Sequence, residues 1–438
     1  MFALAVKLAE QNLLKGGSPC WQKGLTMKIV HQICCGIDVH SKMLVACLIH
    51  ASGEKEIRTF GTMTWGLLQL RDWLLAAGCQ HVAIESTGVY WKPVFNILED
   101  GLTVILINPE HARALRGRKT DVKDAERIAD LLQAGSLNAS FIPPPEVREL
   151  RELTRYRESV VRERSAVANR VQKVLESGNI KLGQVASDPL GVSGRAILRA
   201  LVEGKTDPGE LASLARRQLK EKQAELALSL QGRLTPNQRF VLGELLKRWE
   251  ELAVADRRVT QEIDTYLHDH PKLAQAVKTV DTAPGLGRRA AEIVVAEIGT
   301  DMTEVFPTAA HLASWAGVCP GNKATGGKRL SGRTRKGNTY LRSVLVQAAW
   351  GASMKKNCYL SSQFHRLVKR LGRKKALLAV AHSLLVIIYH MLERDQTYTE
   401  LGGDYFDRHH VEQQRDYHIR RLQMLGLKVS VEELLAAA

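Results

Sequence analysis

Residues 29–135 alternate between short apolar segments and amphipathic segments, and this order constrains the fold more than any other feature of the chain. Residues 29–60 contain three segments rich in β-branched and apolar residues, with a turn at residues 51–54, and predict three strands. The pattern that follows predicts a helix at 64–78, a strand at 81–87, a helix at 89–100, a strand at 102–109 and a helix at 120–135. A meander followed by strand–helix–strand crossovers predicts a mixed sheet covered by helices.

The middle of the chain is dominated by two long charged segments with helical spacing. Three consecutive prolines, Pro143 to Pro145, end the first domain because they cannot continue a helix. Residues 151–176 and 239–267 then predict long helices, and residues 180–210, richer in Gly, Ser and Pro, predict an irregular break between them. We interpret the two helices as an antiparallel coiled-coil arm, and a plain helical bundle is the alternative.

The C-terminal third contains two features that suit a nucleic-acid partner. Pro284-Gly285-Leu286-Gly287, between two helical patterns, is similar to the hairpin of helix-hairpin-helix modules, whose backbone N–H groups grip a phosphate. A simple tight turn is the alternative. Residues 321–338 are rich in Gly, Lys and Arg, and apolar helices predicted at 339–350 and 373–392 can build a core.

The predicted organisation is an α/β domain followed by mostly helical parts. These parts are an N-terminal extension at 1–28, with Met27 as an alternative start, a mixed-sheet domain at 29–142, a helical arm at 146–272, a C-terminal domain at 273–395 and a tail at 396–438. The seven cysteines contain no Cys-x-x-Cys pair, and no apolar run approaches the roughly 20 residues that span a bilayer. We therefore expect a protein of the reducing cytoplasm with no membrane partner.

Four carboxylates stand where a negative charge is costly without a counter-charge. Asp38 ends the first apolar strand and Glu85 ends a later one, and burying such groups is expensive unless a cation compensates them. Asp121 and Asp124 share one face at the start of the last helix, and the same face continues as an apolar stripe. Such oxygen ligands suit Mg²⁺, with Mn²⁺ as a substitute, and paired ions of this kind assist phosphodiester cleavage.

Each acid alone also has a structural explanation. Asp121 would be the N-cap of its helix with Asp124 at N3, and Asp38 would be a turn residue before Ser41. The acids on two separate strands and the pair on the last helix are together much harder to explain by structure alone.

The net charge of +16 favours a polyanionic partner, because cations that neutralise phosphates release counterions. The candidate DNA-binding cations are Lys328, Arg329, Arg333, Arg335 and Lys336 in the C-terminal basic segment, and Arg118 and Lys119 just before the helical acids. Non-specific backbone binding or a solvated loop is the alternative. His40 and His111 lie near the acids in the sequence, and we expect neither to be a metal ligand.

The chain resembles the insertion-sequence one-ten family of transposases over roughly residues 29–390. The resemblance rests on GIDVHSKMLVACLIH, AIESTGVYW, INPEHARALRGRKTDVKDAERIADLL and HLASWAGVCPGNKATGGKRLSGRTRKGNTYLR, which occur in the family's order. That family has an N-terminal RuvC-like domain with an Asp-Glu-Asp-Asp set and a C-terminal serine-type transposase domain of the 116/110/902 type. The resemblance implies a ribonuclease-H-like fold for residues 29–142.

The resemblance also implies a reaction, a cofactor and partners. The family's acidic set corresponds to Asp38, Glu85, Asp121 and Asp124, which would hold Mg²⁺. A C-terminal serine hydroxyl would attack a DNA phosphate and form a covalent link, as in site-specific recombination. The implied partners are DNA of the element ends and of the target, a non-coding guide RNA that pairs with both, and further copies of the chain, from a dimer to a tetramer with composite sites.

This sequence departs from the family at the nucleophile. The position that matches the family's serine is Thr325, whose extra methyl group crowds an in-line attack. Three interpretations follow: Thr325 is the nucleophile, Ser331 has taken the role, or this copy is inactive, and we favour Thr325. Two other functions stay open beside recombination, namely a Mg²⁺-dependent RuvC-like nuclease or junction resolvase and a catalytically degenerate nucleic-acid-binding protein.

Overall fold

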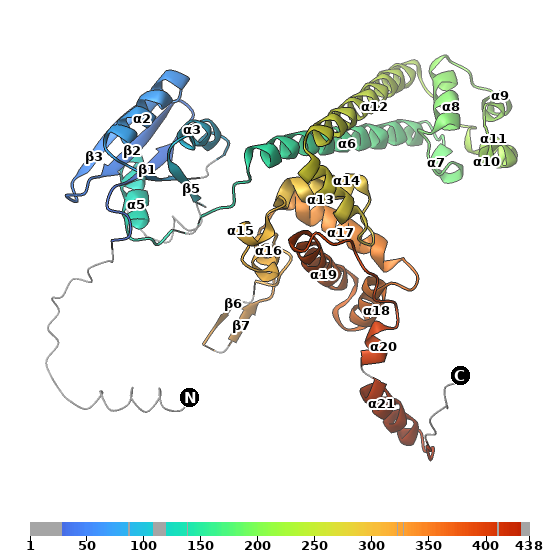
Figure 1. The fold of residues 1–438 in the computed structure, drawn as a ribbon. Helices are drawn as coiled ribbons and strands as arrows, with labels where there is room; N and C mark the ends of the chain where they lie inside the picture. Colours follow the sequence, from blue (N-terminus) through green and yellow to red (C-terminus); the bar gives the residue numbers. More distant parts are fainter. Residues whose placement is uncertain are drawn as a thin grey trace. The chain divides into compact units, whose positions relative to one another are not determined.

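The structure is a computed structural model that describes residues 29–85, 88–107, 120–137, 139–321, 323–326, 328–409 and 411–430. The chain divides into two compact units, Met1–Ile142 and Pro143–Ala438, and Figure 1 shows their elements. The boundary lies in the triple-proline segment, where Pro145 begins the first helix of the second unit. The predicted extension at residues 1–28 lies outside the described residues.

The first unit is built on a mixed five-stranded sheet, as the order of apolar segments predicted. Its strands are β1 (Cys34–Val39), β2 (Met43–Ile49), β3 (Lys55–Gly61), β4 (His81–Glu85) and β5 (Thr103–Ile107), in the spatial order β3-β2-β1-β4-β5. The β1–β2 and β2–β3 pairs are antiparallel because short turns join them, whereas β1–β4 and β4–β5 are parallel because helices cross over between them.

Helices cover both faces of this sheet because side chains alternate along each strand. Cys35, Ile37 and Val39 of β1 pack in one core with α2 (Thr64–Ala76) and α3 (Trp91–Leu98). Cys34 of β1 belongs to the opposite core, which is closed by α5 (Asp121–Gln133). Unit 1 is therefore a three-layer arrangement with α5 alone on one side among the described helices.

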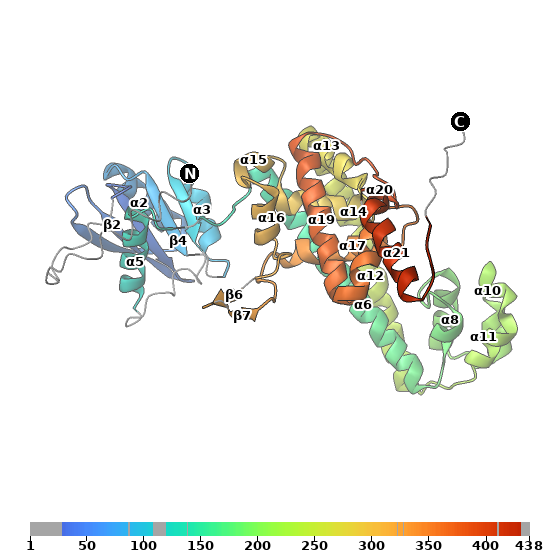
Figure 2. The ribbon, with the colours of Figure 1, turned by 90° about the horizontal axis from the view of Figure 1, so that it is seen from below.

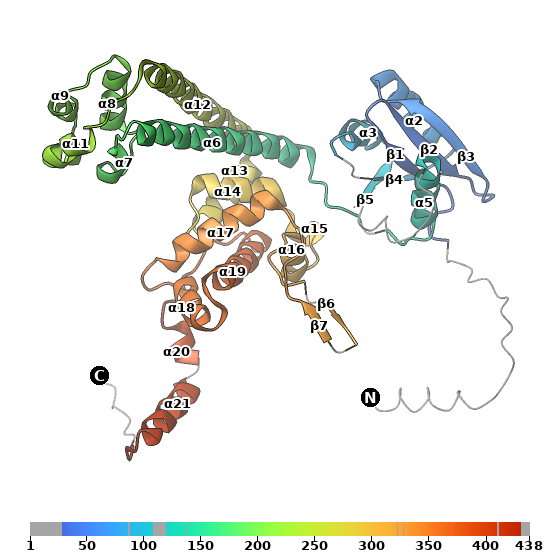
Figure 3. The same ribbon diagram turned by 180° about the vertical axis from the view of Figure 1, so that it is seen from behind.

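The second unit begins with two long helices that lie side by side, α6 (Pro145–Ser177) and α12 (Pro236–Asp269), as Figures 1 and 3 show. The two helices run antiparallel. This direction is shown by the hydrogen bond that Tyr266, near the end of α12, donates to the Glu149 carboxylate, near the start of α6. Farther along, Arg248 pairs with Glu163 at 3.2 Å. Val160, Val167 and Leu252 form a small apolar core between the helices.

The segment between the long helices corrects the sequence prediction. We expected an irregular break at residues 180–210, but the structure has short helices there: α7 (Leu182–Val185), α8 (Val192–Val202), α9 (Pro208–Ser213), α10 (Gln218–Glu221) and α11 (Gln223–Ser229). Buried residues such as Ile197, Leu211 and Leu226 give these helices a core of their own with the ends of α6 and α12. Because the helices are short and punctuated by Gly, Ser and Pro, helical periodicity is hard to see in the sequence.

The remaining helices of the second unit form a bundle beside α6 and α12 (Figure 2). They are α13 (Pro271–Asp281), α14 (Arg288–Ile298), α15 (Met302–Val305), α16 (Ala309–Trp315), α17 (Thr339–Ser353), α18 (Tyr359–Leu371) and α19 (Arg373–Glu393), followed by α20 (Tyr405–His409) and α21 (Val411–Met424). Among the described helices, α19 alone is long and apolar enough to cross a membrane by length and composition. Val380, Leu384 and Ile388 of α19 are fully buried within unit 2, as expected of a core helix.

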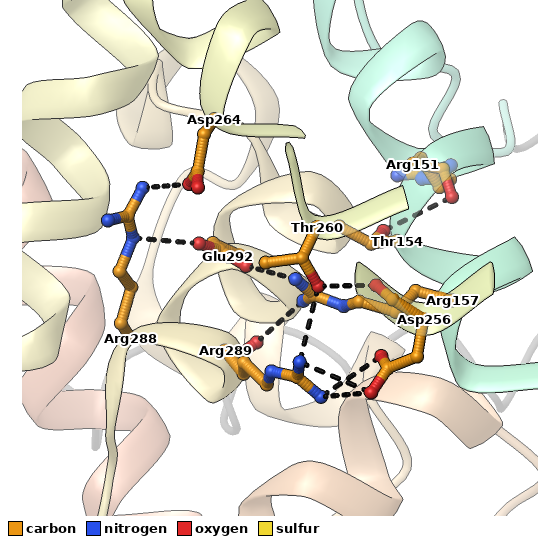
Figure 4. Close-up of polar contacts among 9 residues, drawn as sticks. All are labelled: Arg151, Thr154, Arg157, Asp256, Thr260, Asp264, Arg288, Arg289 and Glu292. Carbon is orange, nitrogen blue, oxygen red and sulfur yellow. Dashed lines mark hydrogen bonds and ion pairs between the residues drawn. The ribbon is translucent and has the colours of Figure 1, made fainter. Parts of the chain in front are cut away.

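A buried polar network fastens α14 to α6 and α12 (Figure 4). Arg157 of α6 and Glu292 of α14 are each about 1 % exposed and form an ion pair of 2.6 Å. Glu292 also accepts a hydrogen bond of 3.0 Å from Arg288. Asp256 of α12 pairs with Arg289 of α14 at 3.2 Å. Since each charge is paired, the network joins the long helices and α14 without leaving an uncompensated buried charge.

Candidate functional site

The strands β1 and β4 bring Asp38 and Glu85 to the same edge and the same face of the sheet. Ile37 is paired with Ile84 in the parallel register, so the next residues lie side by side: Asp38, one residue before the end of β1, and Glu85, the last residue of β4. Side chains alternate along a strand, so Glu85 points to the same face as Ala83, two residues before it. Ala83 packs in the core closed by α5. The face of the sheet that carries both acids is therefore the face covered by α5.

The helix α5 adds the other two acids to this face. Asp121 and Asp124 lie in its first turn, while Thr120 is the N-cap and accepts a hydrogen bond from the backbone N–H of Lys123. The capping role considered for Asp121 thus belongs to Thr120. The Asp124 side chain is 13 % exposed and forms a 3.1 Å ion pair with Arg127, whereas Asp121 is half-exposed and faces the end of β1.

The surroundings of the Asp38 carboxyl disfavour its negative charge. Burial raises the pKa of the Asp38 carboxyl, and the negative charges of Glu85, Asp121 and Asp124 raise it further, while His40 acts in the opposite direction. A carboxylate that feels three others disfavours its own ionisation unless a cation joins the group. The structure therefore gathers Asp38 and Asp121 around His40, while Glu85 lies beside Asp38 by strand register and Asp124 follows about one turn along α5.

His40 completes this group, although the sequence analysis did not expect it to be a ligand. Its Nε2 atom lies 3.4 Å from Asp38 Oδ2 and 3.3 Å from Asp121 Oδ1, so the ring stands between the two carboxylates. The signal was present in the sequence, because a residue two positions after Asp38 at a strand end can turn back to the same side. His111 lies outside the described residues.

The donor set suits a divalent cation. One ligand atom from each of Asp38, His40 and Asp121 lies within 4.8 Å of the others, a spacing at which one ion can contact all three. Carboxylate oxygens are the ligands that Mg²⁺ and Mn²⁺ prefer, and an imidazole suits Mn²⁺ better than Mg²⁺. The burial of Asp38, which is 8% exposed, is the second observation that fits, because a bound cation would compensate a buried negative charge.

The second candidate region is a two-stranded hairpin, β6 (Lys323–Thr325) and β7 (Lys328–Ser331), in the segment expected to be a basic loop. Its backbone pairs Thr325 with Lys328 at the tip, and Ser331 lies opposite Lys323 at the other end. The Ser331 hydroxyl accepts a hydrogen bond from the backbone N–H of Arg333. Hence the two candidate hydroxyl residues occupy different ends of one short hairpin.

The base of this hairpin is fixed to the helical bundle. The N–H of Gly321 donates to the carbonyl of Arg333 at 2.8 Å. A Cβ on Gly337 would lie 2.4 Å from the backbone of Ala316, so only glycine fits there. The next residue, Asn338, caps α17 and donates to Glu297 of α14 at 2.5 Å.

Glu297 links this anchor to the long helix α6. The Glu297 side chain is fully buried, and Arg155 of α6 donates to both of its carboxylate oxygens at 2.7 and 2.8 Å. The Arg155 guanidinium also lies over the ring of Tyr340 in α17, 4.6 Å from its centroid. Sequence reasoning missed this anchor, because Glu297 lies in an otherwise ordinary helical pattern.

The cations expected to contact DNA are exposed wherever the structure describes them. Lys328 in β7, and Arg333, Arg335 and Lys336 after it, are all exposed. The side chain of Arg329 and the residues Arg118 and Lys119 lie outside what the structure describes.

The predicted hairpin at residues 284–287 connects α13 and α14. Gly285 has φ of +82°, and a Cβ there would lie 2.0 Å from the carbonyl oxygen of Ala348 in α17. The hairpin therefore uses glycine for close packing against α17. Gly287, at the N-cap of α14, has open space around it.

Comparison with known proteins places both regions within transposase families. Residues 35–180 match a family described as Transposase, of the DEDD IS110 type, and residues 277–366 match the Transposase IS116/IS110/IS902 family. The first match includes all four acids and the second includes the hairpin. The two regions thus fall in separate matched segments, both described as transposase.

Individual relatives extend this similarity over most of the chain. A probable family 20 transposase of Pseudomonas aeruginosa is 26% identical over 75% of this chain and 89% of its own length. The transposase for insertion sequence element IS1111A of Coxiella burnetii is 25% identical over 74% and 80%, respectively. A pilin gene-inverting protein of Moraxella bovis is 23% identical over 83% and 96%.

Proposed function

Because this chain belongs to the IS110 family of transposases and is an enzyme that acts on DNA, we propose that it cleaves and rejoins DNA strands using Mg²⁺-bound carboxylates and a hydroxyl nucleophile. The observation that supports the metal chemistry best is the cluster of Asp38, His40 and Asp121, with Glu85 beside Asp38 by strand register and Asp124 about one turn along α5. Acids gathered in this way cost stability unless positive charge compensates them.

In this proposal the residues of unit 1 hold the cation and orient it. Asp38 and Asp121 supply carboxylate oxygens on either side of His40, and Glu85 and Asp124 complete the acidic lining. When bound, Mg²⁺ supplies positive charge that stabilises the phosphate oxygens during phosphodiester cleavage. Thr120 fixes the first turn of α5 by capping it, which holds Asp121 and Asp124 at the strand ends.

The residues of unit 2 supply the nucleophile and the phosphate contacts. The hydroxyl oxygen of Thr325, or of Ser331 as the alternative, forms a bond to phosphorus, and the bond from phosphorus to the leaving DNA oxygen breaks. The leaving oxygen takes the electron pair and a proton, and the hydroxyl proton passes to a base. Lys328, Arg333, Arg335 and Lys336 would neutralise phosphate charge beside this hydroxyl.

We also propose a guide RNA and an oligomer as partners. The resemblance described above implies both, and the net charge of +16 suits a protein that binds two kinds of nucleic acid.

The competing proposal is a metal-dependent nuclease that uses water, which requires the same acids but no protein hydroxyl. A protease-sensitive covalent protein–DNA adduct distinguishes the two, because only the hydroxyl mechanism produces it.

The test is DNA cleavage by Asp38→Asn and Asp121→Asn, with Asp72→Asn as the matched control. Asp72 lies on α2, on the other face of the sheet, and its side chain is 66% exposed. We expect both site variants to lose cleavage in Mg²⁺ while DNA binding measured in EDTA is retained, and the control to keep both. Cleavage at the wild-type rate by either site variant would disprove the metal proposal.

A further inference from the structure

The positive charge of the chain is concentrated in one segment. Residues 305–392 contain fifteen lysines and arginines and no aspartate or glutamate, while the whole chain carries +16. The rest of the sequence is therefore close to neutral. A segment of this length without a carboxylate cannot form internal ion pairs, so its cations depend on partners from elsewhere.

Part of this charge lies on the hairpin, but a second group lies at the turn between α18 and α19. Lys369, Arg370, Arg373, Lys374 and Lys375 are all exposed there, and we call these five residues the turn patch. Within the part of the chain that the structure describes, no member of the turn patch has an ion-pair partner. By contrast, three arginines of α6 and α12, namely Arg157, Arg164 and Arg248, each pair with an acid.

The local structure holds the turn patch together. Gly372 joins the two helices with φ of +75°, a conformation that favours glycine, so α18 ends and α19 begins within a single residue. The Arg373 guanidinium lies 4.2 Å from the ring centroid of Trp350, which fixes that side chain by stacking. The turn therefore concentrates five like charges that repel one another in the free protein.

The arrangement at the start of α19 is unfavourable without an anion. Arg373, Lys374 and Lys375 occupy the first turn of α19, where the helix dipole already places positive charge. No side chain caps this end of the helix. The repulsion in the patch, and not the helix end alone, indicates that a polyanion neutralises it.

We propose that the turn patch is a second phosphate-backbone contact for nucleic acid, separate in sequence from the basic hairpin. The proposal rests on the proposed function, because it assigns a further surface to the same nucleic-acid partners. An anionic membrane is the less suitable partner, since membrane-surface segments place apolar side chains beside their cations. Here the exposed residues from 369 to 375 are charged residues and glycine.

The test compares two variants that each lose two exposed lysines. Lys374→Gln/Lys375→Gln removes charge from the turn patch, and Lys220→Gln/Lys222→Gln removes the same charge near α10, where Glu221 and Glu225 are close in sequence. Binding to a duplex DNA and to a structured RNA is measured by fluorescence anisotropy in EDTA from 50 to 300 mM salt. For two lost phosphate contacts the slope of log K against log salt falls by about 1.8 on duplex DNA.

We expect the patch variant to show this smaller slope on DNA, on RNA or on both, and the control to keep the wild-type slope. A loss confined to one probe identifies the nucleic acid that the patch contacts. Lys374→Arg/Lys375→Arg should retain the wild-type slope, which shows that the charge is responsible. Three outcomes would overturn the proposal: equal losses in the patch and control variants, no loss in the patch variant, or patch-dependent binding to phosphatidylserine vesicles in place of nucleic acid.

Binding in EDTA does not depend on cleavage, so this result is separable from the metal proposal. If Asp38→Asn kept its cleavage activity while the patch variant lost salt-dependent binding, the metal assignment would fail and the turn patch would stand. If Asp38→Asn lost cleavage while the patch variant kept the wild-type salt dependence, the turn-patch proposal would fail and the metal assignment would stand.

Discussion

The backbone of Gly36 in β1 passes so close to α5 that a Cβ on Gly36 would lie 2.3 Å from the amide nitrogen of Ala129. The neighbouring atom is backbone and not a flexible side chain, so the helix itself would have to move. Gly36 stands two residues before Asp38, and Ala129 follows Asp121 and Asp124 along α5. This contact therefore sets the distance between the strand acid and the helical acids.

Gly36→Ala should disturb stability and activity together. Overpacking in a core costs about 1–3 kcal/mol, and we expect the upper end of that range because the clash involves the α5 backbone. Urea denaturation measures the loss, and the cleavage rate should fall further than that of an equally destabilised protein. Gly61→Ala is the control, since a Cβ there has nothing within 4 Å. Equal behaviour of the two variants would contradict the close approach.

Asp38→Asn should stabilise the metal-free protein at neutral pH. The pKa of Asp38 is raised in the folded state, so the stability contributed by its protonated form is present below the ordinary pKa and is lost as the pH rises through the raised value. At pH 7 in EDTA the variant should therefore melt at a higher temperature than the wild type in calorimetry. A saturating cation should stabilise the wild type, by about 2.7 kcal/mol at 100 times Kd, but not the variant. A wild type indifferent to Mg²⁺ and Mn²⁺ would argue against the site.

His40→Gln tests whether the ring between Asp38 and Asp121 is part of the cation site. If it is a ligand or orients one, the affinity for Mn²⁺ should fall about 10-fold or more, as measured by titration calorimetry. His50→Gln is a suitable control, because His50 pairs with Glu56 at 3.1 Å and is not part of the acidic group. Unchanged Mn²⁺ affinity in His40→Gln would show that His40 does not contribute to cation binding.

The Arg157–Glu292 pair should behave as a buried ion pair. Glu292→Met leaves the buried Arg157 without a carboxylate partner and should cost about 3–5 kcal/mol, and Arg157→Met should cost less because Glu292 keeps its contact with Arg288. The double variant should cost clearly less than the sum of the two. Arg248→Met removes the exposed pair with Glu163 and should cost less than about 1 kcal/mol. Additive losses in the cycle would mean that the two side chains do not interact as described.

The nucleophile is tested by trapping the covalent adduct on DNA. With Thr325 as the nucleophile, Thr325→Ala abolishes the adduct, Thr325→Ser retains or increases it because the crowding methyl is gone, and Ser331→Ala leaves it intact. The opposite result for the two alanine variants would transfer the role to Ser331. Absence of any adduct, together with metal-dependent cleavage, would favour the nuclease.

The strands of the sheet were predictable because apolar segments mark them, and the sequence put Asp38 and Glu85 near the ends of β1 and β4. The face of the sheet that carries both acids became clear only from the observed register and the position of α5. The short helices near Ile197 were missed because each is only one to three turns long. The Arg157–Glu292 pair was also missed, since on a charged helix a buried arginine has the same sequence pattern as a solvated one.

The hairpin of β6 and β7 is a sheet of two short strands, pinned at Gly321 and Gly337 and extending from the bundle at its tip. An isolated two-stranded ribbon is at best marginally stable in water, so its far end gains order from whatever it touches. The consequence is that a nucleic-acid strand bound at that end would stiffen the ribbon from the side opposite its anchor.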